Sequence, residues 1–158
     1  MAEIAQREPK THLLLIGDGS LRSQIQQKVI QNGLANRVTF AGLRPDIPQL
    51  MLGAIDLFLL PSIYEGLGLV LIEAQAAGLP CVFSDVVPEE ANAVKPLVRQ
   101  VSLSKSASDW AEAVISARSA ASGITQAETL AVLENTPFNI AASVKKLTEV
   151  YEANLSNS

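Results

Sequence analysis

The sequence predicts an α/β domain in which a Rossmann-like, mainly parallel sheet is flanked by helices and followed by a helical C-terminal segment. Up to residue 103, short apolar runs alternate with longer amphipathic runs, which is the pattern of repeated strand–helix units. The apolar runs are nearly continuous, as in strands buried on both faces of a sheet. After Ser104 the apolar residues recur at helical spacing. A chain of 158 residues is expected to form a single domain over residues 1–158.

The predicted strands are the short apolar runs, and residues that stop regular structure bound them. The first run ends at Gly17, the third ends at Pro61, and Pro80 leads into the fourth. The five predicted strands are residues 12–16, 38–42, 56–60, 81–84 and 97–103.

The predicted helices follow from apolar residues at intervals of three and four. Asp46 is well placed to begin one helix and Ser108 to cap another, and Trp110 and Tyr151 are expected to pack in the core. The last helix carries one apolar stripe, made of Ile140, Val144, Leu147, Val150 and Tyr151. The helices predicted in this way are residues 21–30, 45–52, 68–77, a helix beginning near 108, 126–133 and 138–155.

Composition excludes several classes of protein. The net charge of −4 argues against binding to nucleic acid or an anionic membrane, which requires a basic surface. The single cysteine, Cys81, cannot form an internal disulfide and indicates a reducing, cytoplasmic compartment; in its apolar run it is expected to be an inert core thiol. Residues 1–10 lack the apolar core of a signal peptide. The apolar region around Glu73 is interrupted at Gly78 and Pro80, so it is not expected to span a membrane.

Glu73 is the only Asp, Glu, Lys, Arg or His between Gly66 and Ser84. Burying an unpaired carboxylate costs several kcal/mol, so in such an apolar helix Glu73 is expected to meet a polar partner. The alternative is a glutamate that faces solvent on a half-exposed helix.

The loop before this helix has features of a nucleotide site. It follows the strand at 56–60, and open parallel sheets bind ligands beyond the carboxyl ends of their strands. Gly66 and Gly68 allow the backbone to approach a ligand closely, and the helix that begins there offers N–H groups and partial positive charge to a phosphate. Glu73, about two turns further on, suits the hydroxyl donors of a ribose.

Glu65 and Glu73, with seven residues between them, resemble the E-x7-E motif of retaining glycosyltransferases of the GT-B fold, in the family 4 or group 1 transferases. The surrounding phrase, residues 61–85, is similar to that family's signature. Three further segments resemble the family in its own order, namely LLLIGDGSLRSQIQQ, RVTFAGLRPDIPQLM and FNIAASVKKLTEVYE. The resemblance covers nearly the whole chain and implies the C-terminal, donor-binding lobe of such an enzyme.

The resemblance implies roles for individual residues toward a nucleoside-diphosphate sugar. Glu65 would be the catalytic residue that faces the transferred sugar and its leaving phosphate, and Glu73 would hold the ribose hydroxyls. Backbone atoms of three turns would make the other donor contacts: Gly66, Leu67 and Gly68 at the diphosphate or sugar, Gly42, Leu43 and Arg44 along the nucleobase, and Gly17 and Gly19 near the nucleotide. For Arg44 the alternative is a solvated loop arginine. No cofactor and no metal site are expected, because the chain has no Asp-x-Asp, Cys-x-x-Cys or His-Glu-x-x-His sequence.

The sequence departs from the family in two places. The family's lobe begins with one more strand, which lies between the strands matched by residues 12–16 and 56–60 and leads to an Arg and a Lys that grip the diphosphate. That strand, both cations and the acceptor-binding lobe have no counterpart in these residues, and the resemblance implies that residues 2–8 match the end of the helix that follows the strand. Two strands are therefore expected to keep unpaired edges, through which copies of the chain would be able to associate, and the isolated chain is not expected to be a competent transferase. After Asp85, residues 86–90 read Val-Val-Pro-Glu-Glu where the family often has glycines.

Three hypotheses follow. The first is the nucleotide-sugar-binding lobe of a glycosyltransferase that acts with retention on a saccharide or lipid acceptor. The second is a non-catalytic α/β module, derived from that fold, that uses exposed sheet edges for assembly. The third, a flavodoxin-like nucleotide-binding protein, has less support because no phosphate loop follows the first strand.

Overall fold

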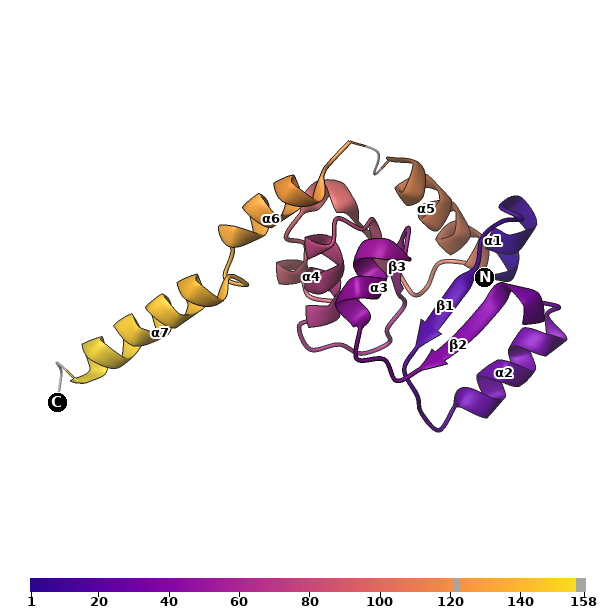
Figure 1. Cartoon of the computed structure of the whole chain (residues 1–158), viewed down its shortest axis with the longest axis horizontal. Helices are drawn as coiled ribbons and strands as arrows, with labels where there is room; N and C mark the ends of the chain where they lie inside the picture. Colours follow the sequence, from indigo (N-terminus) through magenta and orange to yellow (C-terminus); the bar gives the residue numbers. More distant parts are fainter. Residues whose placement is uncertain (121–122, 156–158) are drawn as a thin grey trace.

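The computed structural model describes residues 1–120 and 123–155 and has the predicted α/β architecture (Figure 1). All five predicted strands are present and every pairing between them is parallel. The strands are β1 (Leu13–Ile16), β2 (Val38–Gly42), β3 (Phe58–Leu60), β4 (Cys81–Ser84) and β5 (Val98–Val101).

The predicted helices are also confirmed, with ends that differ by at most two residues where an end was predicted. The helices are α1 (Ala2–Arg7), α2 (Arg22–Gln31), α3 (Ile47–Gly53), α4 (Leu69–Ala76), α5 (Ala107–Ala120), α6 (Gln126–Glu134) and α7 (Ile140–Leu155). Short 3-10 turns at Ala35–Arg37, Glu89–Ala91 and Lys95–Leu97 complete the connections. No helix among the described residues is both long and apolar enough to cross a membrane.

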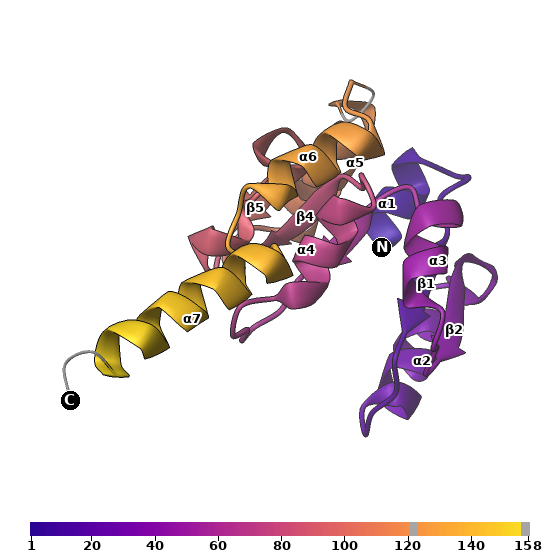
Figure 2. The same ribbon diagram turned by 60° about the vertical axis from the view of Figure 1, so that its left-hand side comes forward.

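The strands form two separate sheets, one of β1 and β2 and the other of β3, β4 and β5. Within the described residues, β1 pairs only with β2 and β3 only with β4, so the expected unpaired edges are present. Figure 2 shows β1, β2 and α2 gathered on one side of the molecule and α4, β4 and α6 on the other. The side chains of β1 and β3 are half-buried, whereas those of β4 are fully buried.

The core lies around β4, between α4 and α5. Phe83 and Cys81 of β4 are fully buried and pack with Leu71 of α4 and Met51 of α3. Burial raises the pKa of the Cys81 thiol to about 12, so Cys81 is the inert core thiol that the sequence predicts.

Two helix starts differ from the sequence prediction. Ser106, and not Ser108, caps α5: its hydroxyl accepts a hydrogen bond from the Asp109 N–H at 3.1 Å, while the Asp109 carboxylate accepts from the Ser106 N–H at 3.0 Å. This reciprocal pair is a capping box, and Ser108 instead bonds Arg7 of α1. Asp46 does stand at the start of α3, but its side chain makes no capping bond.

Helix α7 starts near α4 and then extends away from the rest of the chain (Figures 1 and 2). Its apolar stripe is present as predicted but is not buried, since all of its side chains that the structure describes are exposed. The expectation that Tyr151 packs in the core is therefore wrong: Tyr151 is 65% exposed. Trp110, in contrast, is half-buried, and its indole N–H donates to the Ser102 carbonyl oxygen at 3.2 Å.

Candidate functional site

The loop between β3 and α4 lies at the carboxyl end of β3, where the sequence places the donor site. Helix α4 begins directly after Gly68, whose φ is +70°. A Cβ at Gly68 would strain this conformation and would lie 3.4 Å from Cγ1 of Val87. Gly66, two residues earlier, has no positive φ and faces open space. The turn into α4 thus requires glycine at position 68 only.

Hydrogen bonds fix the acidic residue of this loop. The buried hydroxyl of Ser84 on β4 donates to the Ser62 carbonyl oxygen at 2.5 Å, and the Ser62 hydroxyl donates to Oε1 of Glu65 at 3.1 Å. Glu65 is half-buried, so its carboxylate is held against the carboxyl ends of β3 and β4. Neither serine is among the residues predicted from the sequence; a hydroxyl that ends an apolar strand, as that of Ser84 does, is the signal that indicates one of them.

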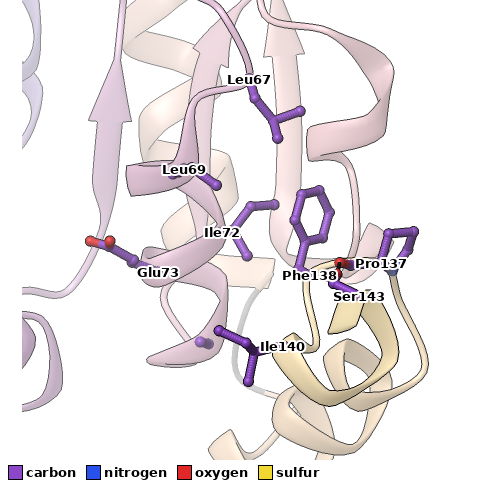
Figure 3. A pocket seen from close by; sticks show the side chains of 9 residues that line it. Leu67, Leu69, Ile72, Glu73, Pro137, Phe138, Ile140 and Ser143 are labelled. Atoms are coloured by element: carbon purple, nitrogen blue, oxygen red, sulfur yellow. Dashed lines mark hydrogen bonds between the residues drawn. The ribbon is translucent and has the colours of Figure 1, made fainter. Parts of the chain in front are cut away.

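Glu73 does not have the buried polar partner that the sequence analysis expected. It is exposed on α4, and no hydrogen bond or ion pair of its carboxylate is found in the part of the chain that the structure describes. Figure 3 shows this carboxylate pointing away from the apolar side chains on the other side of α4. The structure therefore has the alternative, a glutamate that faces solvent. Its carboxylate is accessible to a ligand.

The polar group that α4 does bury is Gln75. Its side-chain amide donates to the carbonyl oxygens of Leu71 at 3.0 Å and Ala91 at 2.8 Å, and its oxygen accepts from the Val94 N–H at 2.8 Å. These bonds attach the segment after β4 to α4. Gln75 is not among the predicted site residues, because α4 has apolar residues on every side and its sequence therefore shows no periodicity that marks the buried face.

A second cluster of predicted site residues forms where β1 and β2 end. The Gly17 N–H donates to the Gly42 carbonyl oxygen at 2.8 Å, and both glycines have positive φ, +121° and +67°. Asp18 accepts from the Gly19 N–H at 2.8 Å and lies 3.4 Å from the guanidinium of Arg22. The structure therefore joins two turns that are far apart in the sequence into one surface.

Beside this surface, Leu43 is 81% exposed and Arg44 is already bound by Asp46. The Arg44 guanidinium donates to both carboxylate oxygens of Asp46, at 2.8 and 2.5 Å. The hydrogen bond from Arg44 lowers the pKa of Asp46. An exposed arginine paired with its neighbour fits the alternative of a solvated loop residue, and its contact with a nucleobase stays a prediction.

A pocket of about 560 Å³ lies between α4 and the start of α7 (Figure 3). Its lining is mainly apolar; Ser143 and Glu73 also line it, although the carboxylate of Glu73 points away from the apolar side chains. The apolar lining residues are Leu67, Leu69, Ile72, Ala76, Pro137, Phe138 and Ile140. Two of them, Leu67 and Leu69, flank Gly68, so the pocket borders the predicted donor loop. Within the described residues, no group of three or more His, Cys, Asp or Glu side chains is arranged to hold a metal ion.

Comparison with known proteins decides the family. Residues 1–119 match the family model described as glycosyl transferases group 1. The chain belongs to this family. The chain is also similar to the protein named as glycosyltransferase EpsF of Bacillus subtilis (strain 168), with 39% identity over 151 residues, which are 95% of this chain and 38% of EpsF.

Solved structures give the same fold. The glycosyltransferase from Rickettsia africae ESF-5 superposes with a TM-score of 0.82 at 21% identity, over 99% of this chain and 44% of its own. Anabaena HepE in complex with UDP superposes with a TM-score of 0.76 at 25% identity, over 96% of this chain and 43% of its own. The predicted group 1 family and GT-B fold are confirmed. The chain spans only about two fifths of the length of these relatives, and the roles of individual site residues stay predictions.

Proposed function

We propose that this group 1 chain is the nucleotide-sugar-binding lobe of a retaining glycosyltransferase, which moves a sugar from a nucleoside-diphosphate donor to a saccharide or lipid acceptor. In this proposal the donor binds to the residues described above, and the acceptor binds to a lobe that they do not include. The solved relative HepE is described as a complex with UDP, which supports a uridine nucleotide as the first donor to test.

The observation that carries the proposal is the arrangement at the start of α4. The helix begins at a glycine at the carboxyl end of β3, so its first N–H groups and its dipole are available to a diphosphate. Glu65 is held beside that helix start by Ser62, and the carboxylate of Glu73 is exposed further along the same helix. Along the chain, Glu65, the start of α4 and Glu73 would thus meet the sugar, the diphosphate and the ribose, which is the order in which a nucleotide sugar presents these parts.

The proposed chemistry follows from the charges of the reaction. The bond between the anomeric carbon and the diphosphate oxygen breaks, and both of its electrons leave with the diphosphate, so negative charge collects there. A bond to the acceptor hydroxyl oxygen forms on the same face of the sugar, and the proton of that hydroxyl passes to the departing diphosphate. Backbone dipoles at Gly66, Leu67 and Gly68 would stabilise that charge. Glu65 would stabilise the positive charge that develops on the sugar ring. The proposed reaction uses no metal and no resident cofactor. We also propose a cytoplasmic location, as expected from the single cysteine.

A second function, a non-catalytic assembly module, is favoured by one observation. Within the described residues the sheet is divided, and β1 and β3 each have a free edge. Such edges bind other strands readily, and in this alternative they would be the working surface of the protein.

Calorimetric titration tests the proposal. UDP, GDP, ADP and their common sugar conjugates are titrated into the wild-type chain and into Glu73→Ala and Glu134→Ala, the latter an exposed glutamate on α6. We expect one nucleotide to bind the wild type and Glu134→Ala equally, and to bind Glu73→Ala about tenfold or more weakly, because two ribose hydrogen bonds to a charged acceptor are lost. A folded wild-type chain that binds none of the nucleotides would contradict the proposal and leave the assembly module.

A further inference from the structure

A half-buried arginine lies at the surface that the turns after β1 and β2 form. Arg22 is the first residue of α2, and its guanidinium lies 3.4 Å from the carboxylate of Asp18 in the turn after β1. Its Cζ lies 5.8 Å from the centre of the Phe40 ring on β2, which is within the range of a cation–π contact. A Cβ at Gly42 would lie 3.8 Å from its Nη1. The guanidinium is therefore held against the turn after β2.

The N–H groups of this guanidinium have no acceptor in the part of the chain that the structure describes. The contact with Asp18 is an ion pair without a hydrogen bond, and only 35% of the Arg22 side chain is exposed. A guanidinium has five N–H groups, and half-buried N–H groups are unfavourable unless water or a ligand accepts from them. Arg44, beside the same surface, differs because its N–H groups already donate to Asp46. Of these two arginines, Arg22 is the one that can donate to a ligand.

The place of Arg22 on its helix also indicates a role other than stability. A positive charge in the first turn of a helix is repelled by the positive end of the helix dipole. Helix α2 has no acidic residue in that turn, so only the ion pair with Asp18 offsets this repulsion. Residues that break a local rule of this kind are typical of functional sites.

We propose that Arg22 recognises the nucleobase of the nucleotide sugar by donating hydrogen bonds to a carbonyl oxygen at the edge of the base. This inference rests on the proposed function, in which residues 42–44 lie along the nucleobase and the start of α4 receives the diphosphate. Arg22 packs on the turn at Gly42, whereas α4 lies on the other side of the molecule from α2 (Figure 2). The base is therefore the part of the nucleotide that Arg22 would meet.

The N–H groups of Arg22 would select among bases by one chemical group. Uracil and guanine carry a carbonyl oxygen, an acceptor, where cytosine and adenine carry an amino group. A guanidinium can donate to this oxygen, and in guanine also to the neighbouring N7. Against an amino group it would set N–H groups against N–H groups, which disfavours that base. We therefore expect a uridine or guanosine diphosphate sugar, and not a cytidine or adenosine diphosphate sugar.

Calorimetric titration of the 158-residue chain with two pairs of nucleotides, UDP with CDP and GDP with ADP, tests the assignment. We expect the wild type to bind the carbonyl-bearing member of the pair that it accepts about tenfold or more tightly than the amino-bearing member. Arg22→Ala should bring this ratio close to one by weakening the binding of the carbonyl-bearing nucleotide. Lys28→Ala is the matched control: it removes the same charge at an exposed position further along α2 and should keep the wild-type ratio.

The ratio within a pair separates base recognition from a structural role. If Arg22 only held the two turns together, or bound a phosphate, Arg22→Ala would weaken all four nucleotides equally and leave the ratio unchanged, which would overturn the inference. A wild type that binds both members of a pair equally, or prefers the amino-bearing one, would overturn it as well and leave the proposed function standing. A folded wild type that binds none of the nucleotides would overturn both.

A second variant guards against misfolding of Arg22→Ala. Arg22→Lys keeps the positive charge and N–H groups but lacks the planar arrangement of the guanidinium. Its ratio should lie between that of the wild type and that of Arg22→Ala, and circular dichroism shows whether each variant is folded. An Arg22→Lys chain whose ratio is below that of Arg22→Ala would contradict recognition through N–H groups.

Discussion

The hydroxyl of Ser84, buried at the end of β4, donates a hydrogen bond of 2.5 Å to the carbonyl oxygen of Ser62. Ser62 in turn donates to Glu65, so one side chain of the central strand fixes the backbone that positions the predicted catalytic carboxylate. The loop between β3 and α4 is thereby coupled to the core and is not an independent surface feature.

Replacing this hydroxyl should therefore affect both stability and ligand binding. For Ser84→Ala we expect the free energy of unfolding to fall by about 1–2 kcal/mol, because the partly buried Ser62 carbonyl loses its partner. Binding of a nucleotide sugar should weaken more than binding of the free nucleotide, since Glu65 is predicted to face the sugar. Urea unfolding followed by circular dichroism, together with calorimetry on both ligands, measures the two effects. Ser23→Ala, at an exposed position of α2, is the control; equal stability of the two variants would contradict the role given to Ser84.

Two glycines of the same loop should respond differently to alanine. Gly68→Ala should lower the free energy of unfolding by about 1–2 kcal/mol, because its positive φ is unfavourable for a residue with a Cβ and that Cβ would press on Val87. Gly66→Ala should change it by less than about 0.5 kcal/mol, since a Cβ there meets open space. Thermal unfolding of the two variants gives the comparison. If Gly66→Ala were the more damaging of the two, the loop conformation described for β3–α4 would be wrong.

Most of the fold could be predicted from the sequence because its signals are local. Gly17, Pro61 and Pro80 bound strands that are nearly all apolar, and this pattern is typical of a parallel sheet. Even the cap of α5 has a local signal, because Ser106 is followed three residues later by Asp109. The prediction of Ser108 as the cap does not take this spacing into account.

What the sequence could not indicate depends on packing between distant elements. Apolar residues surround α4, so its buried face is chosen by β4 and by the segment that follows it, and Gln75 is buried there while Glu73 is exposed. The stripe on α7 correctly predicted an amphipathic helix, but periodicity does not say whether the covering partner belongs to the same chain. This is why Tyr151 was wrongly expected in the core.

The buried network of Gln75 should be one of the most sensitive points of the domain. In Gln75→Leu the Ala91 carbonyl and the Val94 N–H lose the partners that the amide provides, and each unsatisfied buried group costs about 1–3 kcal/mol. We expect the free energy of unfolding to fall by about 2–5 kcal/mol. Gln24→Leu, on the exposed side of α2, provides the matched control in urea unfolding. A loss below about 0.5 kcal/mol for Gln75→Leu would show that the network does not hold the segment after β4.

The buried thiol of Cys81 should make stability depend on alkaline pH. Burial raises its pKa from 9.0 to about 12, so above pH 9.0 the unfolded chain releases this proton while the folded chain keeps it. The unfolded state then binds fewer protons than the folded state, and the free energy of unfolding falls as pH rises between these two pKa values. From pH 8 to 10 the loss due to this group should be about 1 kcal/mol. Urea unfolding of the wild type and of Cys81→Val, in the presence of a reductant, isolates the contribution of the thiol, because every other group titrates equally in both chains. The wild type should lose more stability than Cys81→Val over this range; equal losses would mean that the thiol is not buried in the folded state.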